Sequence, residues 1–268
     1  MICLCGGDRL EVVHTYQAPP EGEVGFGFSG QDYLRQLHRC RSCGHFLSTH
    51  EMNDDALYDG EYVDATYGDL SGMTATFERI NKLPAGRSDN FGRVRHVHEY
   101  CAPRVTGRDL LDVGSGLCVF PYRMKAEGWD CTALDTDARQ VRLANEVAGV
   151  RGVQGVLGDD PKLGTFDVIT FNKVLEHVKD PVAMLRSCLP HLHHPGVVYI
   201  ELPDGEAAIE DELGPGREEF FIEHHHAFSA ASIAILIERA GLTLLELQRL
   251  QEPSTKYTLR AFAAPRSP

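Results

Sequence analysis

The sequence lacks any long apolar run. No stretch of its 268 residues approaches the roughly 18 apolar residues that a membrane-spanning helix needs. The opening ten residues, MICLCGGDRL, have neither the basic start nor the apolar segment of a secretory signal. We therefore expect a cytoplasmic protein with no membrane partner.

Positive charge is also scarce. The chain has 26 Lys and Arg against 39 Asp and Glu, which gives a formal net charge of −13 at pH 7. Such an acidic chain repels a phosphate backbone, so we expect no nucleic-acid partner. One basic cluster predicts either a solvated helix face or a pocket for an anionic substrate. It consists of Arg87, Arg93, Arg95, His96 and His98.

The eight cysteines are unevenly spread, and four of them crowd the first 43 residues. In a reducing compartment such residues are thiols or metal ligands more often than disulfides. Cys40 and Cys43 have the spacing of half a zinc site, and Gly44 follows them. The four thiolates predict a closed, structural Zn²⁺ site, and the alternative is four free thiols. The predicted ligands are Cys3, Cys5, Cys40 and Cys43, any one of which His14, His45 or His50 can replace.

Residues 1–50 show weak helical periodicity and several turn signals. Such a segment builds little hydrophobic core of its own and needs an additional cross-link to be stable, which the metal would supply. Two helices are expected next, at 72–81 and 88–101, the second capped by Ser88.

From residue 108 onward, short apolar runs alternate with helical patterns, which is typical of an α/β fold with a parallel sheet. A final antiparallel hairpin is expected at 242–250 and 256–263. The predicted parallel strands are 109–113, 130–134, 152–157, 166–171 and 197–201, and the helices between and after them are 119–127, 138–147, 181–189 and 230–240.

A glycine turn follows the first of these strands. Gly114 and Gly116 let the backbone turn tightly and approach a ligand closely. Asp135 ends the next strand, 21 residues after Gly114, close to the roughly 20 expected of a carboxylate that binds ribose hydroxyls. The alternative role of Asp135 is to cap the following helix. The pattern indicates a nucleoside-type cofactor on this turn.

Taken together, these motifs resemble the class I S-adenosylmethionine-dependent methyltransferases. The resemblance covers about residues 106–265 and implies a Rossmann-like seven-stranded sheet, with the last strand inserted antiparallel beside the fifth. The matching segments are Asp112-Val113-Gly114-Ser115-Gly116, with Cys118 where a further glycine is common; Gly158-Asp159-Asp160; Phe166-Asp167-Val168-Ile169; Glu176-His177-Val178-Lys179-Asp180-Pro181; and Pro195-Gly196-Val197-Val198-Tyr199-Ile200.

The resemblance also implies a division of the chain and a cofactor site. We expect a zinc-binding module at 1–55, a helical lid or linker at 56–105 and the methyltransferase domain at 106–268. By the resemblance, the glycines approach the amino-acid part of S-adenosylmethionine, while the adenine lies between two aspartates. The expected cofactor residues are Asp112, Gly114, Ser115, Gly116, Asp135, Thr136, Asp159, Asp160, Asn172 and Lys173.

The zinc-bearing segment and the histidine-rich loop 223–226 resemble the deoxysugar C-methyltransferases. The resemblance implies a small-molecule acceptor, such as a nucleotide-linked keto-sugar methylated beside its carbonyl. His224 would be the base, Glu223 would orient it, His177 would stabilise the enolate, and Tyr67 would cover the substrate.

Three alternatives stay open. The same histidine would serve an O-methyltransferase acting on a sugar or secondary metabolite, or a methyltransferase of another metabolite. The chain can also be a zinc-module binding protein with an inactive methyltransferase domain, although Asp112 and Asp135 are intact. A nucleic-acid methyltransferase is disfavoured by the acidic charge and by Asn172-Lys173-Val174, where such enzymes carry a proline-rich motif.

Overall fold

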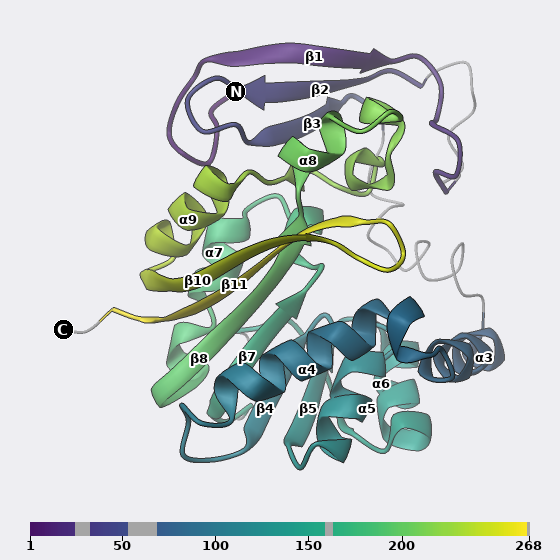
Figure 1. Cartoon of the computed structure of the whole chain (residues 1–268), viewed down its shortest axis with the longest axis vertical. Helices are drawn as coiled ribbons and strands as arrows, with labels where there is room; N and C mark the ends of the chain where they lie inside the picture. Colours follow the sequence, from purple (N-terminus) through teal and green to yellow (C-terminus); the bar gives the residue numbers. More distant parts are fainter. Residues whose placement is uncertain (25–32, 53–68, 159–162, 267–268) are drawn as a thin grey trace.

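The computed structural model describes residues 1–24, 33–52, 69–158 and 163–266. Their strands form two sheets, one of seven strands and one of four. In Figure 1 the four-stranded sheet lies across one end of the molecule, and the strands of the larger sheet run away from it.

The seven-stranded sheet has the order β10-β11-β8-β7-β4-β5-β6. Strands β8, β7, β4, β5 and β6 are parallel, whereas β11 is antiparallel to both β8 and β10. This is the seven-stranded methyltransferase sheet that the sequence predicted, including the inserted final strand. The strands are β4 (Asp109–Val113), β5 (Asp130–Asp135), β6 (Arg151–Gln154), β7 (Phe166–Asn172), β8 (Leu192–Pro203), β10 (Leu242–Gln251) and β11 (Tyr257–Pro265).

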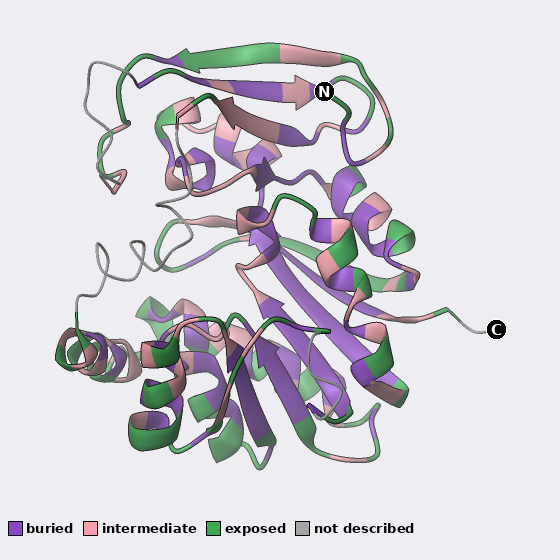
Figure 2. Cartoon of the chain, turned by 180° about the vertical axis from the view of Figure 1, so that it is seen from behind, coloured by how far each residue is buried: buried purple, intermediate pink, exposed green. Residues whose placement is uncertain are grey.

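Helices cover both faces of this sheet because its central strands are apolar on both sides. In β4, Leu110 faces an apolar cluster built with α4 (Asp89–Cys101) and α5 (Val119–Ala126), whereas Leu111 faces a second cluster built with α7 (Pro181–Arg186) and α9 (Ala230–Arg239). Figure 2 shows the central strands as buried and the outer faces of the helices as exposed. The core therefore lies in two layers, one on each side of the sheet.

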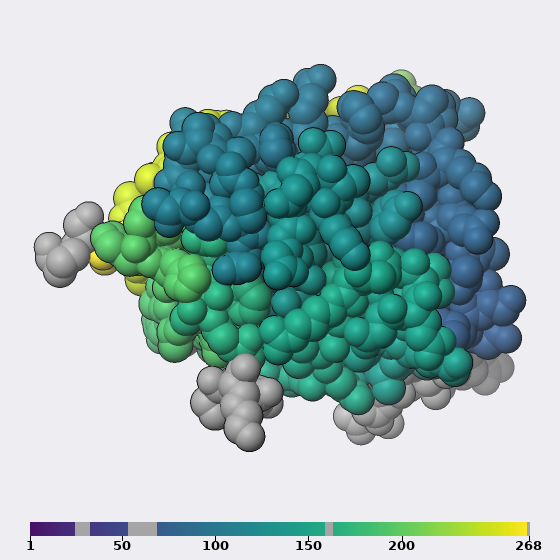
Figure 3. Space-filling view, turned by 90° about the horizontal axis from the view of Figure 1, so that it is seen from below, coloured from purple at the N-terminus to yellow at the C-terminus, as the bar shows by residue number. Residues whose placement is uncertain are grey.

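Local sequence signals start several helices. The Ser88 hydroxyl accepts a hydrogen bond from the Phe91 amide and caps α4, as expected. Asp69 caps α3 (Leu70–Asn81) in the same way. Seen from the end opposite the four-stranded sheet, the segments from α3 through α6 (Ala138–Leu143), in blue and teal, cover much of the surface (Figure 3).

The four-stranded sheet combines the N-terminus with a distant loop. Strands β1 (Leu10–Tyr16), β2 (Arg35–Cys40) and β3 (Phe46–His50) form antiparallel pairs, and β3 also pairs with β9 (His226–Ala227). From its weak helical periodicity and its turn signals, the sequence predicted a segment with little core of its own here. The four-stranded sheet shares its core with a distant part of the chain, because Tyr16, Leu37 and Phe46 pack with side chains from 208–227. The division into three domains stays a prediction.

No helix among the described residues is long and apolar enough to cross a membrane.

Candidate active site

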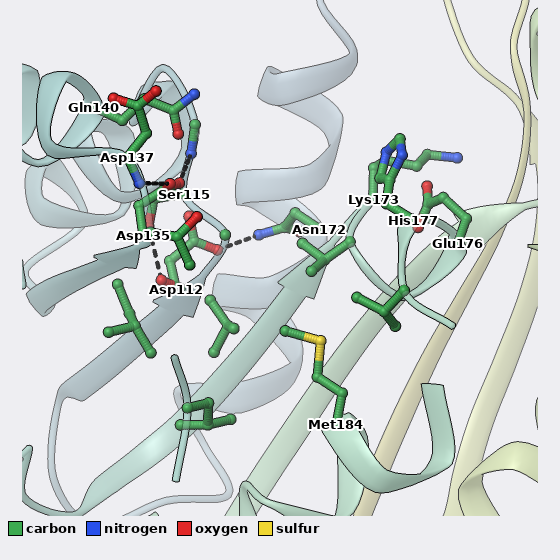
Figure 4. A pocket seen from close by; sticks show the side chains of 18 of the residues that line it. Asp112, Ser115, Asp135, Asp137, Gln140, Asn172, Lys173, Glu176, His177 and Met184 are labelled. Carbon is green, nitrogen blue, oxygen red and sulfur yellow. Dashed lines mark hydrogen bonds between the residues drawn. The ribbon is translucent and has the colours of Figure 1, made fainter. Parts of the chain in front are cut away.

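One large cavity opens at the carboxyl ends of β4, β5 and β7. Its volume is about 1380 Å³, and its lining comes mainly from the loops after these strands and from 218–224, with further residues from α4, α7 and the hairpin turn at Lys256. We call the lining within 112–140 the glycine end and the lining within 173–178 and 218–224 the histidine end. Figure 4 shows the two ends separated across the pocket. It labels Asp112, Ser115 and Asp135 on one side and Lys173, Glu176 and His177 on the other.

The glycine turn has the conformation that the sequence predicted. Gly114 and Gly116 have positive φ angles of 64° and 51°. A Cβ atom on Gly114 would lie 2.8 Å from the Val174 side chain, whereas the space beside Gly116 is open. Cys118, which stands where a further glycine is common, also has a positive φ, 55°, and it starts α5.

Asp135 closes the glycine turn from the end of β5. Its two carboxylate oxygens accept hydrogen bonds from the Gly116 and Asp137 amides, both at 3.0 Å. Burial raises the pKa of this carboxyl, and the backbone hydrogen bonds oppose that rise. Thr136 follows it in the cavity lining. The alternative role, capping of the following helix, belongs to Asp137, whose side chain accepts a hydrogen bond from the Arg139 amide at 2.8 Å. Asp135 instead holds the turn and lines the cavity.

Asp112 lies beneath the turn and is almost fully buried. Its Oδ1 accepts hydrogen bonds from Thr170 and Asn172, both at 2.6 Å, and the Ser115 hydroxyl donates to its carbonyl at 2.7 Å. Burial raises the pKa of Asp112 to about 6 in spite of these bonds. Asp112 and Asn172 therefore anchor β4 to β7 under the glycine turn.

At the histidine end, His177 and His224 meet edge to face with ring centroids 4.8 Å apart. Nδ1 of His177 lies 2.9 Å from the Glu223 carbonyl, and Nδ1 of His224 lies 3.0 Å from the Glu219 carbonyl. A carbonyl only accepts, so each Nδ1 carries the proton and each Nε2 holds the lone pair. Burial lowers the pKa of both rings, which keeps them neutral near pH 7. The neutral ring of His224 thus lines the cavity as a hydrogen-bond acceptor at Nε2.

The structure differs from the expected role of Glu223. Its carboxylate does not orient His224, because the Glu219 carbonyl holds that ring, and Glu223 offers its own carbonyl to His177 instead. Backbone carbonyls of the loop at 218–224 thus hold both rings in place of the expected side chain. Three other predicted residues, Tyr67, Asp159 and Asp160, lie outside the described residues.

Sequence reasoning missed Glu176, although it lies next to His177 in a motif that was recognised. Its side chain is fully buried, and neither of its oxygens has a hydrogen-bond partner among the described residues. Burial raises its pKa to about 7, and the nearby Lys173 ammonium opposes that rise. Only the fold shows that this carboxyl lines the cavity.

The residues of the predicted basic cluster lie in different environments. Arg95 is exposed and lies 3.9 Å from Glu99, as expected of a solvated face. Arg93 instead turns inward, lines the cavity and forms a two-point ion pair with the fully buried Glu201. Its charge is therefore already compensated. Lys173 at the end of β7 donates to the Thr258 hydroxyl at 3.1 Å, and burial lowers its pKa.

The four predicted cysteine ligands come together in the N-terminal sheet. Sγ of Cys3 lies 3.5 Å from that of Cys43, and Sγ of Cys5 lies 3.7 Å from that of Cys40. All four sulfurs lie within 4.8 Å of one another. A tetrahedral site with Zn–S bonds of about 2.3 Å places its sulfurs about 3.8 Å apart, so this set fits Zn²⁺. His45, one of the candidate substitutes, instead bonds to His226 and Ser232.

Comparison with known proteins agrees with this geometry. Residues 87–247, more than half of the chain, match the family model described as a methyltransferase domain. The chain belongs to this methyltransferase family.

Curated relatives match about half of the chain. The ubiquinone biosynthesis O-methyltransferase of Colwellia psychrerythraea is 26% identical over 164 residues, which cover 55% of this chain and 63% of that protein. The protein of the same name from Vibrio campbellii is 31% identical over 146 residues, covering 52% of this chain and 58% of that protein. The chain thus matches less than two thirds of the length of either relative.

Among solved structures, the Burkholderia thailandensis 1,6-didemethyltoxoflavin-N1-methyltransferase, with its named substrate and S-adenosylhomocysteine bound, shares the fold. The TM-score is 0.55 at 18% identity, and the match covers 86% of this chain and 99% of that one. At this identity the likeness concerns the fold alone.

Proposed function

We propose that this protein transfers a methyl group from S-adenosylmethionine to a small-molecule acceptor. One observation carries the proposal: the glycine turn with Asp135 and the paired histidines face the same cavity from opposite ends. The sulfonium supplies an electrophilic methyl group when the cofactor is bound. Gly116 and Asp135 would hold the nucleoside and amino-acid parts, and Asp112 and Asn172 would keep the turn in place.

In this reaction, Nε2 of His224 takes the proton from the acceptor. The electron pair left on oxygen or carbon forms the new bond to the methyl carbon as the carbon–sulfur bond breaks, and the proton stays on the imidazole. The Glu219 carbonyl bond keeps Nε2 unprotonated beforehand. His177 lies against this ring and would stabilise the charge that develops on the acceptor.

For the acceptor, we propose a nucleotide-linked sugar or a secondary-metabolite precursor. The resemblance of the histidine loop and cysteine module to deoxysugar C-methyltransferases supports this choice, while the names of the curated relatives support oxygen as the atom methylated. The compensated charge of Arg93 gives no extra support for an anionic acceptor. Zn²⁺ on the four cysteines would have a structural role, because a four-thiolate set leaves no open position.

The direct test is incubation with methyl-labelled S-adenosylmethionine and a panel of nucleotide-linked keto- and hydroxy-sugars, together with phenolic metabolites. Label transfer is read by mass. We expect transfer to at least one acceptor, and loss of an α-proton would identify carbon methylation. Cofactor binding without transfer to any member would favour the second candidate, a binding protein with an inactive methyltransferase domain.

His224→Ala should lower turnover by about 10²–10⁴-fold, the usual contribution of a general base. Because His224 lies at the histidine end, affinity for S-adenosylhomocysteine should stay unchanged by calorimetry. Turnover near that of the unchanged protein would remove His224 from the mechanism.

A further inference from the structure

Buried carboxylate oxygens without partners gather at the histidine end. Three buried oxygens have no hydrogen-bond partner among the described residues: both carboxylate oxygens of Glu176 and Oε2 of Glu223. Burying an unsatisfied polar group is costly, and proteins rarely retain such groups without a use. Since both residues line the cavity, a ligand there can supply the missing bonds.

The groups around Glu176 define what the ligand must offer. A Glu176 oxygen and ring nitrogens of His177 and His224 lie within 4.8 Å of one another. Nε2 of His224 accepts, because its Nδ1 donates to a carbonyl. The ammonium of Lys173 is directed to Thr258. This end of the cavity thus presents mainly acceptors, and it requires a ligand rich in donors.

Two kinds of ligand satisfy a carboxylate: a cation and a group of neutral donors. The ammonium of Lys173 already acts on the charge of Glu176. A second cation would meet its repulsion in a medium of low dielectric. Neutral hydroxyls bring no such repulsion, and two neighbouring hydroxyls can each donate to one oxygen of a single carboxylate.

We propose that Glu176 binds the methyl acceptor directly and recognises an uncharged vicinal diol on it, with one or both hydroxyls donating to this carboxylate. This inference rests on the proposed function, since it names the substrate class of the same site. With the diol held by Glu176, the adjoining reactive position lies against the neighbouring His224. Glu176 would then select acceptors by their hydroxyl pattern, while His224 removes the proton.

The test uses protein loaded with S-adenosylhomocysteine and three matched pairs of probes: catechol and phenol, cis-1,2-cyclohexanediol and cyclohexanol, and a methyl pyranoside and its deoxy analogue. Affinity is measured by ligand-observed NMR titration. In at least one pair, the diol should bind about tenfold more tightly, as expected of a hydrogen bond to a charged group. Glu176→Gln and Glu176→Ala should each abolish this preference.

Glu146→Gln is the matched control, because Glu146 is exposed, pairs with Arg142 and lies outside the cavity. The Glu146→Gln variant should keep the preference for diol over mono-ol. Equal binding of diol and mono-ol in every pair, or a preference that survives both Glu176 variants, would overturn the inference. So would a preference that requires added Mg²⁺ or Zn²⁺ and disappears on chelation. Failure of S-adenosylhomocysteine itself to bind would contradict the proposed function instead.

Discussion

Three buried carboxyls near the ends of the central strands have different pKa values because their partners differ. Glu201 faces the guanidinium groups of Arg93 and Arg260, and these cations hold its pKa well below its usual range despite burial. The hydrogen-bond donors to Asp112 are neutral and the charge of Arg93 offsets burial only in part, so its pKa rises to about 6. Glu176 has no hydrogen-bond partner among the described residues, and its pKa rises to about 7. The different partners thus account for the order of the three pKa values.

The pH dependence of stability follows from the raised pKa of Glu176. Folding raises this pKa from 4.5 to about 7, so the folded state binds the proton more tightly than the unfolded state. Stability is therefore greatest below about pH 4.5 for this group and falls as the pH rises toward 7. The charged groups that act on it are Lys173, Lys256 and Glu201.

Glu176→Gln should remove the loss of stability that accompanies the rise in pH. At pH 8 we expect the variant to have a free energy of unfolding higher by up to about 3 kcal/mol, the equivalent of this change in pKa. At pH 4 the two proteins should be nearly equal. Urea unfolding at both pH values measures the difference. A variant less stable than the unchanged protein at pH 8 would show that Glu176 has a structural role.

The two glycines of the turn offer a matched pair. Both have positive φ, so alanine costs about 1–2 kcal/mol at either position. At Gly114 the new methyl group also meets Val174 at 2.8 Å, and overpacking adds about 1–3 kcal/mol. We expect Gly114→Ala to lower the thermal midpoint more than Gly116→Ala, whose methyl group lies in open space. The reverse order would mean that the turn differs from the one described.

At the scale of elements, β9 links the cysteine cluster to the candidate base. It pairs with β3, and it lies two residues after His224 along the chain. The Ser229 hydroxyl donates to the Cys43 carbonyl at 2.5 Å, and the Ser48 amide donates to the His225 carbonyl at 3.0 Å. The N-terminal sheet therefore supports the loop that carries His224.

Cys40→Ser should lower bound zinc from about one per chain to near zero, as loss of one of four ligands implies. The N-terminal sheet should loosen, and turnover should fall because β9 loses its support, while affinity for S-adenosylhomocysteine is retained. Elemental analysis and calorimetry measure these effects. Cys188→Ala, a buried cysteine outside the cluster, should keep its zinc. Absence of zinc from the unchanged protein would remove the metal site.

The sequence predicted most of the large sheet because its strands are strongly apolar and its turns carry glycine. It missed the four-stranded sheet, since β1 has exposed and buried positions in no regular alternation and β9 has only two residues. Phe46 pairs with Ala227, far away in the sequence, and no local sequence pattern predicts such a pairing.

The same limit applies to the site. Glycine spacing and the position of Asp135 predicted the glycine end, and the EH pair and the histidine run predicted the rings at the other end. The bond from His224 to the Glu219 carbonyl, the burial of Glu176 and the inward turn of Arg93 depend on tertiary contacts. Sequence periodicity carries no information on any of them.

At the scale of the whole molecule, the seven-stranded sheet brings the glycine end and the histidine end together around one cavity. The glycine end follows β4 and β5, and the histidine end follows β7 and the loop before β9. Ligands of open α/β sheets bind at the carboxyl ends of the strands, and both ends of this cavity lie there. The central claim is that the glycine end holds S-adenosylmethionine.

Calorimetric titration with S-adenosylhomocysteine tests that claim most directly, with NADH as the competing dinucleotide and Asp135→Ala as the variant. We predict binding of one S-adenosylhomocysteine per chain, no binding of NADH, and an affinity about 10–100-fold lower in Asp135→Ala, because hydrogen bonds to a charged group are lost. Binding of NADH without binding of S-adenosylhomocysteine, or full affinity in the variant, would contradict the account.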